Sequence, residues 1–99
     1  MDPSRVKEKL IAVIEQIQES AHLDCPPLTG TTKPAIEVPK FKSPIWLIAT
    51  TLLAIELDIE ISNKVNLFID KRTKLPRSID ETVGFVCGLL DSVKEAKTA

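Results

Sequence analysis

The feature that most constrains the fold of this chain is an apolar stretch from Ser43 to Ile61, which reads SPIWLIATTLLAIELDIEI. Between Ile45 and Ile55 the only polar residues are two threonines, so a helix built from this sequence has almost no stripe that faces water. We therefore expect a central helix over 44–57 that is nearly surrounded by protein and forms the core of the fold.

The last part of this stretch has a second possible structure. From Ile55 to Ile61 apolar and acidic residues alternate, which is the period of a half-buried strand. We favour a helix to about Leu57 followed by an extended turn, because the apolar run before it is too long for a typical strand; the strand alternative stays open. A membrane helix is rejected, since Glu56 and Asp58 interrupt the run and a span needs about 18 or more apolar residues.

The start of the stretch gives Ser43 a structural role. A helix start favours a side-chain oxygen that accepts a hydrogen bond from an unpaired backbone N–H, and it tolerates proline at the first helical position. Ser43 followed by Pro44 fits both preferences. We expect Ser43 to be the N-cap of the central helix.

Length and charge limit the possible classes of protein. A chain of 99 residues predicts one domain over 1–99, and a net charge of −1 gives no electrostatic footprint for nucleic acid. Cys25 and Cys87 lie far apart without metal-ligand spacing, so we expect reduced thiols and no metal site. The N-terminal sequence has no apolar signal core, which favours a cytoplasmic protein.

The segments before the central helix predict a helix and a loop. A helix is expected over 4–21, because Asp2 and Pro3 form a helix start and apolar residues recur at helical spacing. His22, just after it, is interpreted as a C-terminal cap rather than a ligand or base. Residues 24–42 contain four prolines. We interpret them as an ordered crossover loop held by four scattered apolar residues, Leu28, Ile36, Val38 and Phe41.

The segment after the central helix, 62–77, is a connector with an apolar group followed by a basic cluster. The basic residues are Lys71, Arg72, Lys74 and Arg77. A solvated turn is the favoured interpretation, because the cluster lacks the interleaved aromatic residues of a nucleic-acid platform. The alternative is that Lys71 and Arg72 contact an acidic surface of a protein partner.

A last helix is predicted over 79–93. Ser78 and Glu81 have the spacing of a capping box, and the apolar residues Ile79, Val83, Val86 and Leu90 recur on one face. Gly84 and Gly88 each weaken a helix by about 1 kcal/mol relative to alanine, so we expect them to permit a close approach by another helix. The elements together predict an all-α fold, a small bundle of three to four helices with a long first loop.

This order of elements resembles that of acyl carrier proteins, in which a serine begins the second helix. Counted from that serine, a core hydrophobe and an acidic residue, isoleucine and turn recur here as Leu57 and Glu60-Ile61-Ser62. Leu47 and Leu53 fall on core positions of that family. The last helix is similar at Ser78, Ile79, Val83, Phe85 and Val86. The resemblance implies an acyl-carrier-like bundle and a phosphopantetheine group attached at Ser43.

The sequence departs from that family around the serine. The family motif is Asp-Ser-Leu, and this chain has Lys42-Ser43-Pro44. Family members dock basic partner enzymes through acidic residues on the second helix, whereas Ile48 and Ile55 stand at such positions here. The connector is also longer and more basic than in a typical carrier.

Two functions follow from these observations. The first is a carrier that presents an acyl group on phosphopantetheine at Ser43 to acyl-processing enzymes. The alternative is a degenerate carrier-fold interaction module, in which Ser43 is only an N-cap and Trp46, Ile48 and Ile55 contact a protein partner or a second copy. An enzyme is not expected, because the sequence has one histidine and no glycine-rich phosphate loop or metal-spaced ligands; we predict no catalytic residue.

Overall fold

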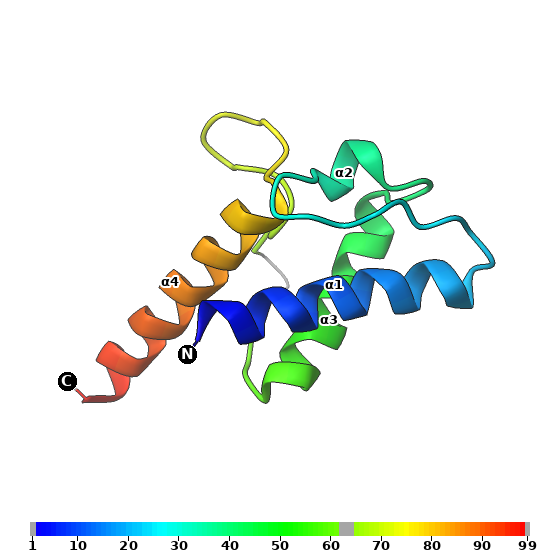
Figure 1. The fold of residues 1–99 in the computed structure, drawn as a ribbon. Helices are drawn as coiled ribbons and strands as arrows, with labels where there is room; N and C mark the ends of the chain where they lie inside the picture. Colours follow the sequence, from blue (N-terminus) through cyan, green and yellow to red (C-terminus); the bar gives the residue numbers. More distant parts are fainter. Residues whose placement is uncertain (1, 62–64, 99) are drawn as a thin grey trace.

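The chain folds as helices joined by two long connecting segments. The computed structural model describes residues 2–61 and 65–98. Within these ranges there are four helices, α1 (Pro3–Ser20), α2 (Pro34–Glu37), α3 (Ser43–Leu57) and α4 (Ile79–Thr98) (Figure 1). These residues contain no strand, only an isolated bridge between Ile69 and Pro76. The predicted all-α class is therefore confirmed.

Both ends of α1 form as its sequence predicts. The Asp2 carboxylate accepts a hydrogen bond from the Ser4 N–H at 2.9 Å, which makes Asp2 the N-cap. At the other end His22 adopts a left-handed conformation with φ of 57°. The Leu23 N–H then donates to the Gln18 carbonyl at 2.8 Å, which closes the helix. The interpretation of Asp2 as the helix start is confirmed. The C-cap is Ala21, and His22 is the left-handed residue that follows it.

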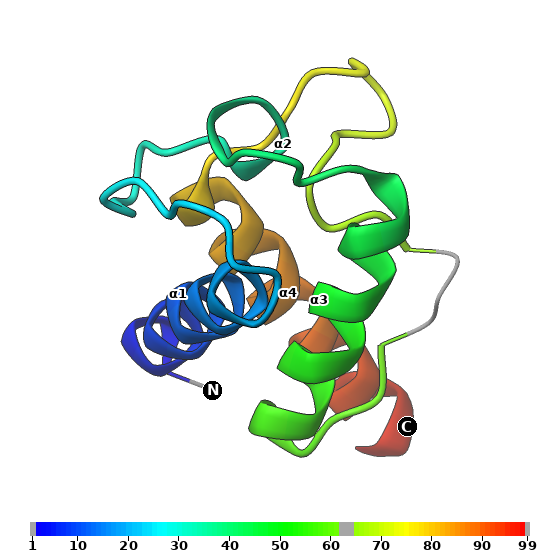
Figure 2. The same cartoon turned by 90° about the vertical axis from the view of Figure 1, so that its right-hand side faces the viewer.

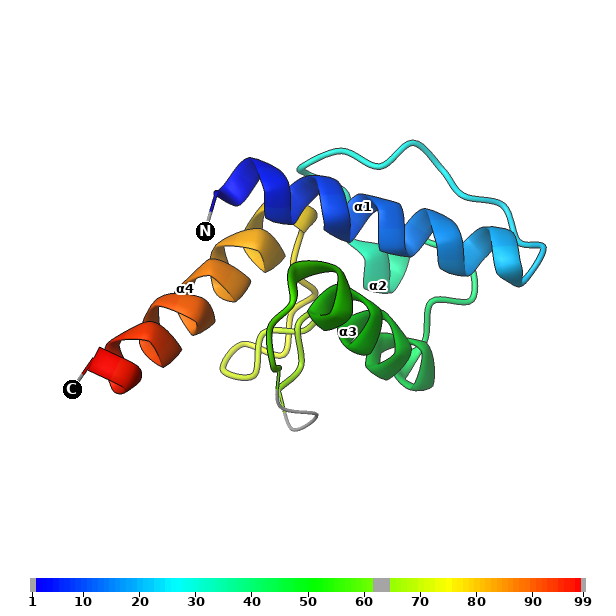
Figure 3. The ribbon, with the colours of Figure 1, turned by 90° about the horizontal axis from the view of Figure 1, so that it is seen from below.

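The element that packs extensively against both other long helices is α1, not α3. It packs against α3 and against α4 (Figures 1 and 3), and it buries Val6, Leu10, Val13 and Ile14. Figure 2, viewed nearly along α1, shows α3 running beside it with one side turned away. The expectation that the 44–57 helix is the centre of the fold is therefore wrong.

One face of α3 is buried and the opposite face is exposed. The buried face carries Ala49, Thr50, Leu53 and Leu57, whereas Leu47 is 52%, Ile48 49% and Ile55 68% exposed. A helix that is apolar all round was expected to be surrounded, and Leu47 was expected in the core; both expectations are wrong. An apolar residue can face solvent, so composition alone does not establish which side meets the core.

The end of α3 resolves the choice between helix and strand. The helix continues to Leu57 and closes at Asp58, which has a φ of 53°. The Ile59 N–H donates to the Ala54 carbonyl at 2.9 Å. The helix to Leu57 is therefore confirmed, and the alternation of acidic and apolar residues after Ile55 does not form a strand.

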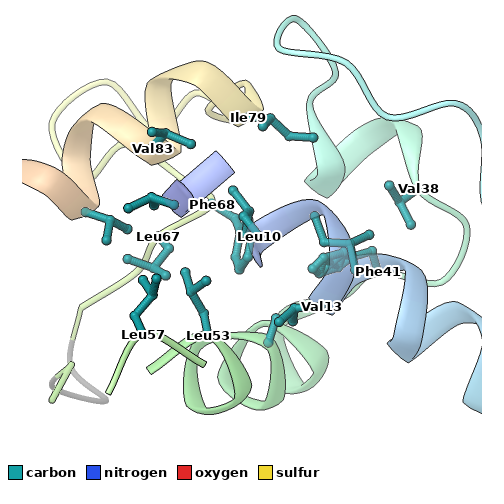
Figure 4. Packing of buried hydrophobic residues seen from close by; sticks show 14 residues of the cluster. Leu10, Val13, Val38, Phe41, Leu53, Leu57, Leu67, Phe68, Ile79 and Val83 are labelled. Carbon is teal, nitrogen blue, oxygen red and sulfur yellow. The ribbon is translucent and has the colours of Figure 1, made fainter. Parts of the chain in front are cut away.

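The hydrophobic core combines helices with both connecting segments (Figure 4). The Phe41 ring of the first loop lies 5.0 Å from the Phe68 ring of the connector, measured between centroids. Each of these phenylalanines is at most 1% exposed. The buried hydrophobic residues are Val6, Leu10, Val13, Ile14, Val38, Phe41, Ala49, Leu53, Leu57, Leu67, Phe68, Ile79, Val83 and Val86.

The first loop is an ordered crossover, as predicted, and one buried side chain holds both of its ends. The Gln18 amide, 1% exposed, donates to the Asp24 carbonyl at 2.9 Å and to the Pro39 carbonyl at 3.0 Å. The loop also contains the single-turn helix α2, which the sequence analysis did not predict. Of the expected anchors, Val38 and Phe41 are buried, whereas Ile36 is 68% exposed.

The connector contains a tight turn that displays three residues of the basic cluster, Lys71, Arg72 and Lys74. The fourth, Arg77, is half-buried, and its guanidinium donates to the Asn66 carbonyl at 2.7 Å. The first residues of the connector, 62–64, lie outside the described part of the chain.

The Asp70 carboxylate accepts hydrogen bonds from the N–H groups of Arg72 at 2.8 Å and Thr73 at 3.3 Å. These bonds lower the pKa of Asp70. Lys71 and Arg72 are exposed on this turn.

The start of α4 is closed by the predicted capping box. The Ser78 N–H donates to the Glu81 carboxylate at 2.9 Å, and the Glu81 N–H donates to the Ser78 hydroxyl at 3.1 Å. The bonds from Ser78 lower the pKa of Glu81. The helix extends to Thr98, beyond the predicted 79–93; the side chain of Leu90 lies outside the described residues.

The glycines play roles other than those expected. Among the described residues, a Cβ at Gly84 or Gly88 would meet nothing within 4 Å beyond the adjoining residues and backbone of α4 itself. No other helix of this chain approaches these two residues there, so the expectation that they admit one is wrong. The close approach occurs at Gly30, where a Cβ would meet the Asp80 carboxylate. The Asp80 N–H donates to the Gly30 carbonyl at 2.9 Å, which joins the first loop to α4.

Candidate functional site

The hydroxyl of Ser43 lies at the start of α3 on an exposed residue. Ser43 is the first residue of the helix, and the N-cap is Lys42, which makes no side-chain capping bond. The prediction that Ser43 is the N-cap is therefore wrong.

The reason lies in the backbone of the first turn. As an N-cap, Ser43 would bond the N–H of Ile45 or Trp46, the second and third helical positions. The N–H groups of Ile45 and Trp46 both donate to the Lys42 carbonyl, at 2.9 Å and 3.1 Å. Because the first turn is satisfied by the backbone, α3 has little need of a side-chain cap.

An open hollow of about 470 Å³ adjoins Ser43. Its walls come from the first turns of α3 and from the connector, and most of them are apolar. The Trp46 indole, one of the walls, donates its N–H to the Phe41 carbonyl at 3.0 Å and lies 6.4 Å from the Phe68 ring. The lining residues are Ser43, Pro44, Trp46, Leu47, Thr50, Val65 and Asn66.

The charge beside this hydroxyl is positive. Lys42, directly before Ser43, is exposed, and the N-terminus of a helix favours an anion. None of the residues that line the hollow is a histidine, an aspartate or a glutamate. The described lining of the hollow therefore places no carboxylate or imidazole beside the serine hydroxyl.

The residues predicted to bind partners fall in three places. Ile48 and Ile55 lie on the exposed side of α3, whereas Trp46 is half-buried and takes part in the hollow. Lys71 and Arg72 lie on the turn that follows Asp70. The structure thus brings Ile48 and Ile55 together but does not join Trp46 or the basic residues to them.

The exposed side of α3 includes residues that the sequence analysis did not select. We call this surface the outer face of α3; its exposed residues are Pro44, Leu47, Ile48, Thr51 and Ile55. They are three or four positions apart, the spacing of one side of a helix. The signal was present in the sequence, but an apolar helix offers no polar stripe to distinguish its outer side.

The sequence analysis also missed one buried polar residue, Gln18, and one exposed apolar residue, Leu75. Gln18 is buried among apolar neighbours on α1, and its position four residues after Ile14 already placed it on the buried stripe. Leu75 is 63% exposed on the basic turn, where nothing in the local pattern distinguished it.

Neither a metal site nor a membrane-spanning helix is found in the described part of the chain. The described residues contain no group of three or more His, Cys, Asp or Glu side chains that could hold a metal ion. In the same ranges no helix combines the length and the apolar character that crossing a membrane requires.

Comparison with known proteins found no match among protein-family models, curated proteins or solved structures. The class of fold is therefore defined by the structure itself, as an all-α globule with a radius of gyration of 13.1 Å, close to the ~13 Å of a compact chain of this length. The resemblance to acyl carrier proteins remains an expectation from the sequence.

Proposed function

We propose that this protein is an acyl carrier that presents an acyl group on a phosphopantetheine arm at Ser43 to acyl-processing enzymes. The observation that carries the proposal is the exposed hydroxyl of Ser43 at the edge of a largely apolar hollow. The hydroxyl makes no capping bond at the start of α3, so attachment of a group would not break one. The serine is therefore available for attachment.

The neighbouring residues suit the chemistry of such an arm. Its phosphate would join the Ser43 oxygen, where the Lys42 ammonium and the N-terminus of α3 favour negative charge. The arm supplies a thiol that holds an acyl group as a thioester. The apolar walls of the hollow, including Trp46 and Leu47, could shelter part of the arm or its cargo from water.

The exposed side of α3 favours a second function. On the outer face, Leu47, Ile48 and Ile55 are each about half exposed or more, and contiguous apolar surface on a soluble protein marks an interface. In this alternative the chain is an interaction module that binds a protein partner or a second copy through α3, and Ser43 carries nothing. Lys71 and Arg72 would contact acidic parts of a partner.

The carrier function is tested by the intact mass of the protein purified from its own host, where the matching transferase is present. We expect an increase equal to one phosphopantetheine arm, and none in Ser43→Ala. The matched control is Ser78→Ala, which also loses a serine at a helix start and should keep the arm. An unmodified wild-type protein, together with full biological activity of Ser43→Ala, would exclude the carrier.

A purified general transferase provides a second test. Such an enzyme reads acidic residues around the serine, so we expect poor modification of a chain with Lys42 and Pro44. The double variant Lys42→Asp, Pro44→Leu should be modified faster. If it stays unmodified while a true carrier is converted in the same tube, the motif is not the obstacle and the family assignment fails.

A further inference from the structure

The outer face of α3 is apolar except for one residue, Thr51, and the hydroxyl of Thr51 already has a hydrogen-bond partner. The exposed residues of this face are Pro44, Leu47, Ile48, Thr51 and Ile55, and none of them is charged. The exposed Glu56 lies at the border of this face, where its carboxylate pairs with the Lys9 ammonium at 3.6 Å. The Thr51 hydroxyl donates to the Leu47 carbonyl of its own helix at 2.9 Å. Thr51 could therefore be covered without leaving an unpaired donor, so the whole face can be buried at low cost.

This face is symmetric about its middle residue. Thr51 stands four residues from Leu47 and four from Ile55. If a second copy of α3 packs against it in the antiparallel direction with Thr51 at the centre, Leu47 of each copy lies level with Ile55 of the other. One Leu47–Ile55 pair then lies on each side of the central Thr51 residues.

The charges at the two ends of α3 select the same direction. Lys42 precedes the helix and Asp58 follows it, and both are exposed. With a rise of 1.5 Å per residue, antiparallel pairing about Thr51 brings Lys42 of one copy to within about 3 Å, along the helix axis, of the level of Asp58 of the other. Parallel pairing would instead set like charges against each other. The levels of the helix ends therefore favour the antiparallel arrangement over the parallel one. Lys42 stands nine residues from Thr51, on the opposite side of the helix, so its long side chain has to pass the end of α3 to reach Asp58.

We infer that the outer face of α3 binds the same face of a second copy of this chain, antiparallel and with two-fold symmetry. A two-fold interface uses one self-complementary patch on both copies, which this face provides. One helix pair buries less than the ~1,200 Å² of a standard stable interface, so the dimer is reversible and forms at high concentration. The inference rests on the α3 interface of the second candidate function alone, and it does not require Ser43 to be unmodified.

Sedimentation velocity tests the pairing with the full chain. The protein is measured from about 5 μM to about 1 mM, the range of weak complexes, and its average mass should rise from 10.9 kDa towards twice that value. Ile55→Glu should remain monomeric throughout, because the dimer would bury an unpaired charge. The matched control is Leu75→Glu, since Leu75 is similarly exposed, at 63%, but lies on the connector; it should dimerise like wild type. Circular dichroism checks that each variant folds.

A charge exchange tests the direction. Lys42→Glu alone and Asp58→Lys alone should each weaken the dimer by about three- to tenfold, because exposed ion pairs contribute little and two are reversed per dimer. An equimolar mixture of the two variants should restore it, since opposite charges then meet at both ends. A lysine is acceptable at the left-handed Asp58, because Lys40 and Lys74 already have positive φ in this chain.

Three results would overturn the inference. The first is a wild-type protein that stays monomeric at about 1 mM, a concentration that detects even weak pairing. The second is equal weakening by Ile55→Glu and Leu75→Glu, which would place the interface elsewhere. The third is a mixture that pairs no better than either charge variant alone, which would exclude the antiparallel direction. The intact mass of Ser43 is read separately, so these results leave the carrier proposal unaffected.

Discussion

The two helices α3 and α4 begin with the same residue type but in different ways. At α4, Ser78 is buried and exchanges two hydrogen bonds with Glu81. At α3, Ser43 is exposed and the N-cap is Lys42, without a side-chain bond. The difference teaches that a serine before a helix is a structural residue only where free N–H groups are within its reach. At Ser43 those groups, the N–H of Ile45 and the N–H of Trp46, already donate to the Lys42 carbonyl.

The two helices also differ in their faces. The buried apolar residues of α4, Ile79, Val83 and Val86, share one side of the helix, as their spacing predicts. In α3 the apolar residues occupy every side, although only one side meets the core. The outward apolar residues of α3 therefore contribute little to the fold, and their presence calls for another explanation.

The largest expected effect separates the two faces of α3. Leu53→Ala should lower the free energy of unfolding by about 2–5 kcal/mol, because it leaves a cavity at a side chain with no exposed surface. Ile55→Ala should change it by no more than about 0.5 kcal/mol, as for other surface positions. Urea unfolding of both variants measures this difference. Similar losses would mean that the outer face is covered in the monomer.

The next effect separates the two serines. Ser78→Ala should cost about 0.5–2 kcal/mol, because the Glu81 N–H loses its acceptor. Ser43→Ala should change the free energy of unfolding by no more than about 0.5 kcal/mol, since no capping bond is lost. The measurement is again urea unfolding at neutral pH. A loss at Ser43 comparable to that at Ser78 would restore its structural role and weaken the carrier proposal.

A smaller effect concerns the exposed glycines of α4. Gly84→Ala and Gly88→Ala should each raise the free energy of unfolding by about 0.5–1 kcal/mol, because alanine is the better helix former and the space around each Cβ is open. Gly30→Ala is the contrasting variant and should gain less, since its Cβ would meet the Asp80 carboxylate, which has to move from its ion pair with Lys7. Thermal unfolding followed by circular dichroism compares the three variants. Destabilisation by either α4 variant would mean that a partner approaches there.

The smallest effect is a pH dependence at the start of α4. The hydrogen bonds from Ser78 lower the pKa of Glu81, so its carboxylate stabilises the fold above the ordinary pKa of a glutamate, about 4.3. This contribution is lost as the pH falls through the lowered pKa of the folded state. Glu81→Gln keeps an acceptor but does not titrate, so its unfolding free energy should fall less steeply in acid. Asp70, whose pKa is also lowered, titrates in both the wild type and the variant and so does not affect the comparison. Identical acid profiles for wild type and Glu81→Gln would exclude a contribution from Glu81.

Local signals in the sequence predicted a large part of this fold. The cap at Asp2, the box at Ser78 and the end of α3 at Leu57 each depend on residues within a few positions of one another. What failed depends on distant contacts. The covered side of α3 is decided by α1, and Gly30 matters because Asp80, fifty positions later, packs against it.

The sequence predicted the residue at the candidate site, Ser43, but it did not predict the hollow beside Ser43 or the outer face of α3. Ser43 was selected from its position before an apolar helix. Its hydroxyl makes no capping bond because the N–H groups of Ile45 and Trp46 donate to the Lys42 carbonyl. The hollow beside Ser43 needs Val65 from another segment. Residue spacing along α3 could have grouped Leu47 with Ile48 and Ile55, but only the packing of α1 shows that this group faces outward.

The contact between the first loop and α4 makes two amide protons unusual. The first N–H groups of a helix normally lack a partner and exchange rapidly with solvent. Here the Ile79 N–H donates to the Thr32 carbonyl at 2.8 Å and the Asp80 N–H donates to the Gly30 carbonyl at 2.9 Å. Their hydrogen-exchange rates therefore report whether the loop is docked, not whether the helix is formed. The exchange of these two backbone amides can thus report opening of the first loop, which leads into Ser43, without an attached probe.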